Sequence, residues 1–215
     1  LGAVTDADLS DDAFPPYRMR HTHIGHAPVF AQRLSFTGET GWEIFVTPDF
    51  AEHVLEIILQ AGQPLGLRLA GGEALNALRI EKGFLHWGAD MAYTEAPYQL
   101  GLDFICKPSK TLPFIGQDAC LARKADPKGP CLRSVRLADP DAILHHNEPV
   151  LRDGRIIGFV TSGSFCAMQK AAVGLCLVSP PGRAGGFEAL EDGHCSVMVE
   201  GREVPAELRR KPFGA

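Results

Sequence analysis

Residues 36–43 read Phe36-Thr37-Gly38-Glu39-Thr40-Gly41-Trp42-Glu43, a glycine-rich stretch that ends on an aromatic residue and a carboxylate. The alternation on either side predicts one strand from Gln32 to Phe36 and a second from Trp42 to Thr47. Two strands joined by a glycine-rich connection are typical of a hairpin. We therefore expect a hairpin in which Glu39 and Glu43 flank the turn.

A glutamate in such a hairpin has two interpretations. Its two oxygens can accept two parallel N–H donors, which is what the amino-pyrimidine edge of a pterin or purine presents beside an aromatic floor. The other interpretation is a solvated glutamate at a strand end. The residue types alone leave both open for Glu43.

Helical signals surround the hairpin in the first half of the chain. Thr47 is a suitable N-cap for a helix over residues 48–62 that begins with proline. Apolar spacing predicts further helices over about 73–82 and 117–124, whereas residues 1–28, rich in aspartate and proline, read as irregular.

The pattern changes after Asp126-Pro127-Lys128-Gly129-Pro130, where we place a domain boundary. Asp153-Gly154 and Glu200-Gly201 are suited to tight hairpin turns between short strands. The strands are expected at 132–137, 150–152, 155–161, 170–178, 195–200 and 202–206. The predicted fold class is α+β over residues 1–125, followed by a small antiparallel β-barrel over residues 126–215.

Bulk properties exclude several classes of function. A net charge of −5 at pH 7 argues against a nucleic-acid partner, which requires a concentration of basic residues. No apolar stretch approaches the roughly 20 residues that a membrane-spanning helix needs. The six cysteines are scattered without a CxxC pair, which predicts reduced thiols and a cytoplasmic location, or the mitochondrial matrix in a eukaryote.

Three further motifs have weak functional readings. His21, His23 and His26 could supply a metal pair, but no other ligand lies nearby in the sequence, so we expect surface histidines and no metal. Residues 161–166 (TSGSFC) lack the spacing of a nucleophile elbow and are expected to form a loop. Residues 182–186 (GRAGG) lack the Lys-Ser/Thr of a phosphate loop and read as a flexible connection.

The segment from Arg79 to Asp90 also has two readings. One is a helix end with exposed charges, followed by a loop with a buried Trp87. In the other, Arg79 holds a ligand carboxylate bidentately. Spacing does not decide between them.

Taken in order, these segments resemble the aminomethyltransferase (glycine-cleavage T-protein) family, and most closely the C-terminal part of sarcosine and dimethylglycine dehydrogenases. The family's Y-T-G-E-x-G-x-E stands here as residues 36–43, and the dehydrogenase branch's L-R-I-E-K-G-x-x-H-W-G-x-D as Leu78 to Asp90. Other matching segments are 96–102 (APYQLGL), 113–117 (PFIGQ), 147–150 (NEPV), 153–154 (DG) and 158–163 (GFVTSG).

The resemblance implies a T-protein-like folate-binding domain, incomplete on its N-terminal side, that binds tetrahydrofolate. It implies that Glu43 recognises the pterin and that Phe36 replaces the family's tyrosine. Leu75 stands where T-proteins have a folate-holding arginine, and Arg79 is the candidate substitute one turn later.

The resemblance also places the family's catalytic aspartate and the dehydrogenases' flavin domain upstream of Leu1. No catalytic residue is therefore assigned, whether the chain is itself an enzyme stays open, and FAD is expected only in a complete parent enzyme or a partner chain. The leading hypothesis is a tetrahydrofolate-binding module that takes a one-carbon unit from a methylamine donor. The alternatives are a non-catalytic interaction subunit that assembles with a separate flavoprotein chain, and an independent aminomethyltransferase or demethylase. The possible partners are folate and either a flavoprotein or the missing N-terminal segment.

Overall fold

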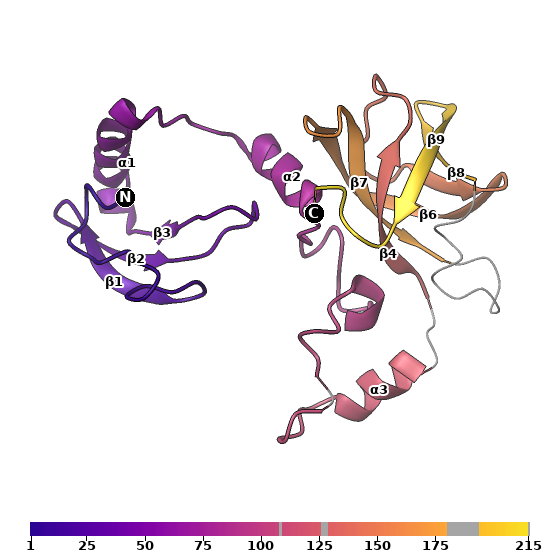
Figure 1. Ribbon diagram of the computed structural model, residues 1–215, viewed down its shortest axis with the longest axis horizontal. Helices are drawn as coiled ribbons and strands as arrows, with labels where there is room; N and C mark the ends of the chain where they lie inside the picture. The colour runs from indigo at the N-terminus through magenta and orange to yellow at the C-terminus, as the bar shows by residue number, and fades with distance from the viewer. Residues whose placement is uncertain (108, 126–128, 180–193, 215) are drawn as a thin grey trace. The chain divides into compact units, whose positions relative to one another are not determined.

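The computed structural model describes residues 1–107, 109–125, 129–179 and 194–214 (Figure 1). The chain divides into two compact units, Leu1–Leu75 and Asn76–Ala215. The break predicted at 126–130 lies partly outside the described residues, as does the glycine-rich connection at 182–186. The predicted domain limits therefore stay a prediction.

The first unit is a three-stranded antiparallel sheet with one helix on one face (Figure 1). The sheet follows the order β1-β2-β3. Period-two alternation sends Val29 and Ala31 of the middle strand into a core that Val54 of the helix completes. The elements are β1 (Met19–Ile24), β2 (Ala27–Gln32), β3 (Glu43–Phe45), α1 (Pro48–Gly62) and the 3₁₀ turn η1 (Gln63–Leu65).

The predicted hairpin is present, but one strand was misplaced. The strand before the connection ends at Gln32, so the prediction of a strand from Gln32 to Phe36 is wrong. The Arg33 side chain turns back to the Phe14 carbonyl at 2.8 Å and to Asp11 at 2.5 Å, and the chain leaves the sheet there. Residues 19–24, read as irregular, are β1, because tertiary pairing with β2 outweighs their mixed composition.

The helices of the chain confirm the sequence signals closely. In α1, Pro48 is the first residue after Thr47, although the Thr47 side chain makes no cap hydrogen bond. The other helical elements are α2 (Gly72–Glu81), the 3₁₀ turn η2 (Pro97–Leu100) and α3 (Gln117–Ala125). Gly83 ends α2 with a φ of +72°, and a Cβ there would lie 2.4 Å from the Pro212 ring, so the position requires glycine. None of the described helices is long and apolar enough to cross a membrane.

Six antiparallel strands close into a barrel in the order β4-β7-β6-β5-β8-β9 (Figure 1), which confirms the predicted fold class. Asp153-Gly154 and Glu200-Gly201 both have positive φ, as two-residue primed turns require. Inward-facing aliphatic residues such as Val135, Val150 and Val197 fill the interior. The strands are β4 (Cys131–Leu137), β5 (Pro149–Arg152), β6 (Arg155–Cys166), β7 (Ala171–Val178), β8 (Cys195–Val199) and β9 (Arg202–Arg209).

The expectation of a loop at residues 161–166 is wrong, because this segment is the second half of β6. Its register with β7 runs from Ser162 opposite Leu175 to Cys166 opposite Ala171. Glycine and serine are weak strand formers, but pairing along β7 overrides that preference. The strand carries two hydroxyl side chains, on Thr161 and Ser162, to the end of α2.

Candidate functional site

A buried polar cluster joins α2 to the barrel inside the second unit. It contains Arg79 of α2, Asp90 of the following loop, and Thr161 and Ser162 of β6. The exposed fractions are 3% for Arg79, 0% for Asp90 and 5% for Ser162. Helix α2, the loop that follows it and strand β6 therefore contact one another through side chains that are buried from solvent.

Hydrogen bonds satisfy nearly every group of this cluster. One carboxylate oxygen of Asp90 accepts from the Arg79 guanidinium and from the His86 N–H at 2.9 Å. The other oxygen accepts from the hydroxyls of Thr161 at 2.6 Å and Ser162 at 2.7 Å. A buried ion pair is tolerated when its remaining lone pairs and protons are satisfied in this way.

The remaining donors of Arg79 also bind within the protein. Its Nε donates to the Asn76 Oδ1 at 2.9 Å, and its two terminal nitrogens donate to the Phe84 carbonyl at 3.1 Å and the Ser162 Oγ at 2.6 Å. The carboxylate that Arg79 binds is therefore that of Asp90, and this ion pair has a structural role. Binding of a ligand by Arg79 stays a prediction, and this geometry does not favour it.

The interpretation of residues 79–90 as a helix end with exposed charges and a buried Trp87 is wrong. Glu81 is buried beside Arg79 on the last turn of α2, whereas 63% of Trp87 is exposed. Burial, and after it the neighbouring Glu81 carboxylate, raises the pKa of the Cys166 thiol. The spacing of residues within α2 could not reveal that Glu81 is buried, because the neighbouring Cys166 lies on β6.

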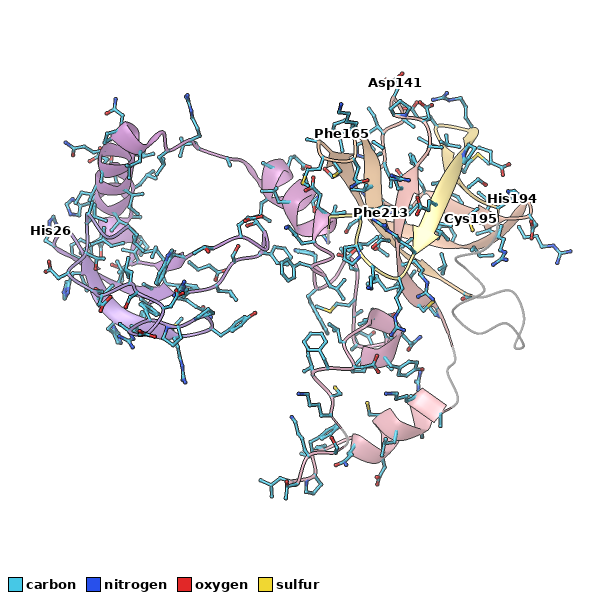
Figure 2. All side chains as sticks on the ribbon, in the orientation of Figure 1. His26, Asp141, Phe165, His194, Cys195 and Phe213 are labelled. Atoms are coloured by element: carbon cyan, nitrogen blue, oxygen red, sulfur yellow. The ribbon has the colours of Figure 1, made fainter. Side chains whose placement is uncertain are left out.

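The C-terminal segment fastens the same helix end, which the sequence did not indicate. The Gly214 N–H donates to the Glu81 carbonyl at 2.9 Å. Phe213, labelled in Figure 2, packs in a small core with Ile80 and Cys166, and the Arg209 guanidinium lies 3.6 Å from its ring centroid. The final residues therefore bridge α2 and the barrel.

Glu43 lies in the first unit, on the sheet face opposite α1. Cross-strand register places it beside Gln32, and the following Ile44 points toward the helix-covered core. Glu43 shares its face with Phe45, whose partner Phe30 is 41% exposed, while Phe45 is 48% exposed. Among the described residues, none donates a hydrogen bond to the Glu43 carboxylate.

The two aromatic residues of the 36–43 stretch take different roles. Trp42 packs edge-on against Phe14 with ring centroids 4.6 Å apart, and the Arg33 guanidinium lies 5.6 Å above its ring. Phe36 is half-buried within the connection before β3. The aromatic residue that accompanies Glu43 on its face is therefore Phe45, and a binding role for Phe36 stays a prediction.

The histidines of β1 lie on this same sheet face. The His21 ring packs against Phe30 at an interplanar angle of 42° with centroids 3.7 Å apart, and His23 follows on the same side of the strand. Within the described parts of the chain, no group of three or more His, Cys, Asp or Glu side chains is arranged to hold a metal ion.

Two family models match the chain. The GCVT N-terminal domain matches residues 1–110, and the glycine cleavage T-protein C-terminal barrel domain matches residues 131–214. The chain belongs to the glycine-cleavage T-protein family. Within that family it is an aminomethyltransferase-type domain related to dimethylglycine and sarcosine dehydrogenases.

Two relatives with similar sequences are much longer than this chain. The chain is 38% identical over 215 residues to 4-methylaminobutanoate oxidase (formaldehyde-forming) of Paenarthrobacter nicotinovorans, covering 99% of this chain and 25% of that protein. It is 39% identical to mitochondrial dimethylglycine dehydrogenase of Rattus norvegicus, covering 99% of this chain and 24% of that protein. The chain thus spans about a quarter of the length of these relatives.

A solved structure supports the T-protein fold. Aminomethyltransferase T of the glycine cleavage system from Bartonella henselae aligns with a TM-score of 0.71 and 21% identity, covering 86% of this chain and 49% of that one. At this identity the likeness establishes the fold alone.

Proposed function

We propose that this chain is a tetrahydrofolate-binding module that takes a one-carbon unit from a methylamine donor. The T-protein family match and the names of the two oxidising relatives support the reaction class. The observation that carries the binding proposal is the Glu43 carboxylate, exposed beside Phe45 without a donor from the described residues.

The chemistry of Glu43 fits a pterin. An ionised carboxylate accepts two N–H donors in a charge-assisted pair, and the amino-pyrimidine edge of a pterin offers two such donors side by side. Phe45 and Phe30 on the same face add apolar surface on which a flat ring can pack. Gln32, opposite Glu43 in the register, supplies a further amide donor and acceptor.

The residues of this chain would bind and orient the acceptor. Bound tetrahydrofolate supplies the nitrogen that accepts the one-carbon unit. Glu43 fixes the pterin edge, while the Arg79–Asp90 cluster keeps α2 rigidly on the barrel. Oxidation of the amine requires a flavin, which we assign to a longer parent protein or a partner chain. Holding the acceptor near that centre raises its effective concentration and limits escape of a reactive aldehyde.

Calorimetric titration with folinic acid tests the proposal. The parent chain should bind, and Glu43→Gln should weaken binding by about 1–3 kcal/mol, which is the value of a charge-assisted hydrogen bond. Glu56→Gln, on an exposed turn of α1, is the matched control and should leave the dissociation constant unchanged. A folded parent that does not bind folinic acid, or equal binding by parent and Glu43→Gln, would contradict the proposal.

A second candidate is an interaction subunit for a separate flavoprotein. It is favoured by large apolar side chains that the second unit exposes near α3: Phe104 is 67% exposed, Ile105 55% and Leu112 80%. Exposed apolar groups of this kind mark interaction surfaces. Copurification with a flavin-containing chain supports this candidate, and a monomeric chain that binds folinic acid alone opposes it.

A further inference from the structure

Three rings lie in one row across the sheet of the first unit, on the face opposite α1. The strand register sets His21 opposite Phe30, and Phe30 opposite Phe45. The His21 and Phe30 rings are in contact, with centroids 3.7 Å apart. Because side chains that lie opposite each other in an antiparallel sheet are neighbours, these residues form an aromatic row that crosses β1, β2 and β3.

Polar side chains lie on both sides of the aromatic row. On one side, the register places Gln32 between Met19 and Glu43, so Glu43 occupies one corner of the face. On the other side, His23 of β1 lies opposite Pro28 of β2. The carboxylate of Glu43 and the imidazole of His23 therefore stand at diagonally opposite corners, with the aromatic row between them.

The two histidines of β1 offer hydrogen-bond donors to solvent. His21 and His23 are both exposed, and no residue that the structure describes hydrogen-bonds the ring nitrogens of either. An imidazole has at least one N–H donor whether it is neutral or charged. Side chains two positions apart on a strand share a face and lie about 7 Å apart. Two donors therefore stand side by side on β1.

We propose that His21 and His23 bind the carboxylates of the glutamate tail of a folate, and that the aromatic row supports its benzoyl ring. This inference rests on the proposed function and assigns the end of the ligand that lies opposite the pterin. A folate presents N–H donors at its pterin edge and carboxylates at its tail. The sheet face presents the acceptor Glu43 at one corner and donors at the other, which is the complementary arrangement.

The dimensions of the sheet fit an extended folate. Two strand spacings of about 4.8 Å and four residue spacings of about 3.4 Å give a diagonal of about 17 Å from Glu43 to His23. A pterin, a benzoyl group and the linker between them extend over a comparable length. With the pterin edge on Glu43, the flat rings can pack on Phe45 and Phe30, which are both partly exposed. The tail then reaches β1.

Calorimetric titration of the whole chain with two ligands tests the proposal. The ligands are folinic acid and its dimethyl ester, in which both tail carboxylates are masked without loss of the rest of the molecule. The parent chain should bind folinic acid about 10- to 100-fold more tightly than the ester, because the ester cannot form charge-assisted hydrogen bonds with the two imidazoles.

Variants of the two histidines should remove this preference. His21→Phe keeps a ring against Phe30 but removes the N–H, and His23→Ala removes the second donor. Each should weaken binding of folinic acid about three- to tenfold and leave binding of the ester unchanged. The control His146→Phe alters an exposed histidine of the second unit and should change neither affinity. Urea unfolding midpoints equal to that of the parent would establish that the variants are folded.

The same titrations separate the tail site from folate binding itself. Glu43→Gln should weaken binding of both ligands alike, because the pterin edge is the same in each. Equal binding of the two ligands by the parent, or parental affinity for folinic acid in both histidine variants, would overturn the tail site. Loss of affinity in Glu43→Gln would in that case still support the proposed function. A folded parent that binds neither ligand would contradict the proposed function and, with it, this inference.

Discussion

The Asp90 carboxylate is ion-paired to the Arg79 guanidinium at the junction of α2 with barrel strand β6, and both side chains are almost entirely removed from solvent. The hydroxyls of Thr161 and Ser162 complete the carboxylate's hydrogen bonds. Because each charge is compensated by the other, the pair orients α2 on the barrel. Loss of either partner would leave a buried charge unmatched.

Asp90→Ala should destabilise the chain strongly. The Arg79 guanidinium would stay buried without its counter-charge, a change that typically costs about 3–5 kcal/mol of the free energy of unfolding. Urea unfolding measures this loss. Asp141→Asn, at an exposed loop of the barrel labelled in Figure 2, is the control and should change stability by less than about 0.5 kcal/mol. Equal stability of Asp90→Ala and the parent would show that the pair does not anchor α2.

The double variant Arg79→Met with Asp90→Ala should lose less stability than the two single losses added together. Removing both charges eliminates the unmatched partner that makes each single variant costly. A thermodynamic cycle from four urea titrations should give a coupling energy of about 1–3 kcal/mol. Strictly additive losses would indicate that the two side chains do not interact in the folded chain.

Phe213→Ala should loosen the end of α2. Phe213 is 6% exposed and packs with Ile80, Cys166 and Val173, so truncation leaves a cavity worth roughly 3 kcal/mol. Hydrogen exchange should become faster at the last turn of α2. Phe165→Ala is matched in chemistry and lies on β6, but its side chain is 56% exposed, so it should have little effect. The prediction fails if both variants behave alike.

Stability should fall as the pH rises from about 9 toward 11. Burial raises the pKa of Cys131 from 9.0 to about 11, whereas the unfolded thiol titrates near 9. In that window the folded state binds the proton and the unfolded state has released it, so the free energy of unfolding decreases with pH. The stabilisation is complete below pH 9 and is lost by pH 11, a change of roughly 2 kcal/mol. Cys131→Ala should show a shallower slope in urea titrations, and an unchanged slope would refute the assignment.

Local signals in the sequence predicted the helices and most barrel strands. Thr47-Pro48 marked the start of α1, Gly83 marked the end of α2, and aspartate-glycine and glutamate-glycine pairs marked two barrel turns. These signals are readable because capping, positive φ and side-chain period act over a few residues. The family motifs were recognisable for the same reason, since each is a short contiguous segment.

The partners of the candidate site residues could not be predicted in this way. The sequence raised Arg79 as a ligand-binding residue, and folding pairs it with Asp90 and Ser162. It raised Phe36 as a folate-binding residue, which stays a prediction, and it did not indicate that the register of β3 places Phe45 on the face of Glu43. Residues 161–166 read as a loop until pairing with β7 made them a strand.

The sequence alone therefore determined the family resemblance, the order of the helices and the barrel class, because these depend on local chemistry and periodicity. The tertiary structure decided which charges are buried and which face of the sheet carries Glu43. Such features arise from contacts between residues tens of positions apart, such as Arg79 with Ser162. Their energies depend on packing and on exclusion of water, and neither is encoded in the spacing of a single segment.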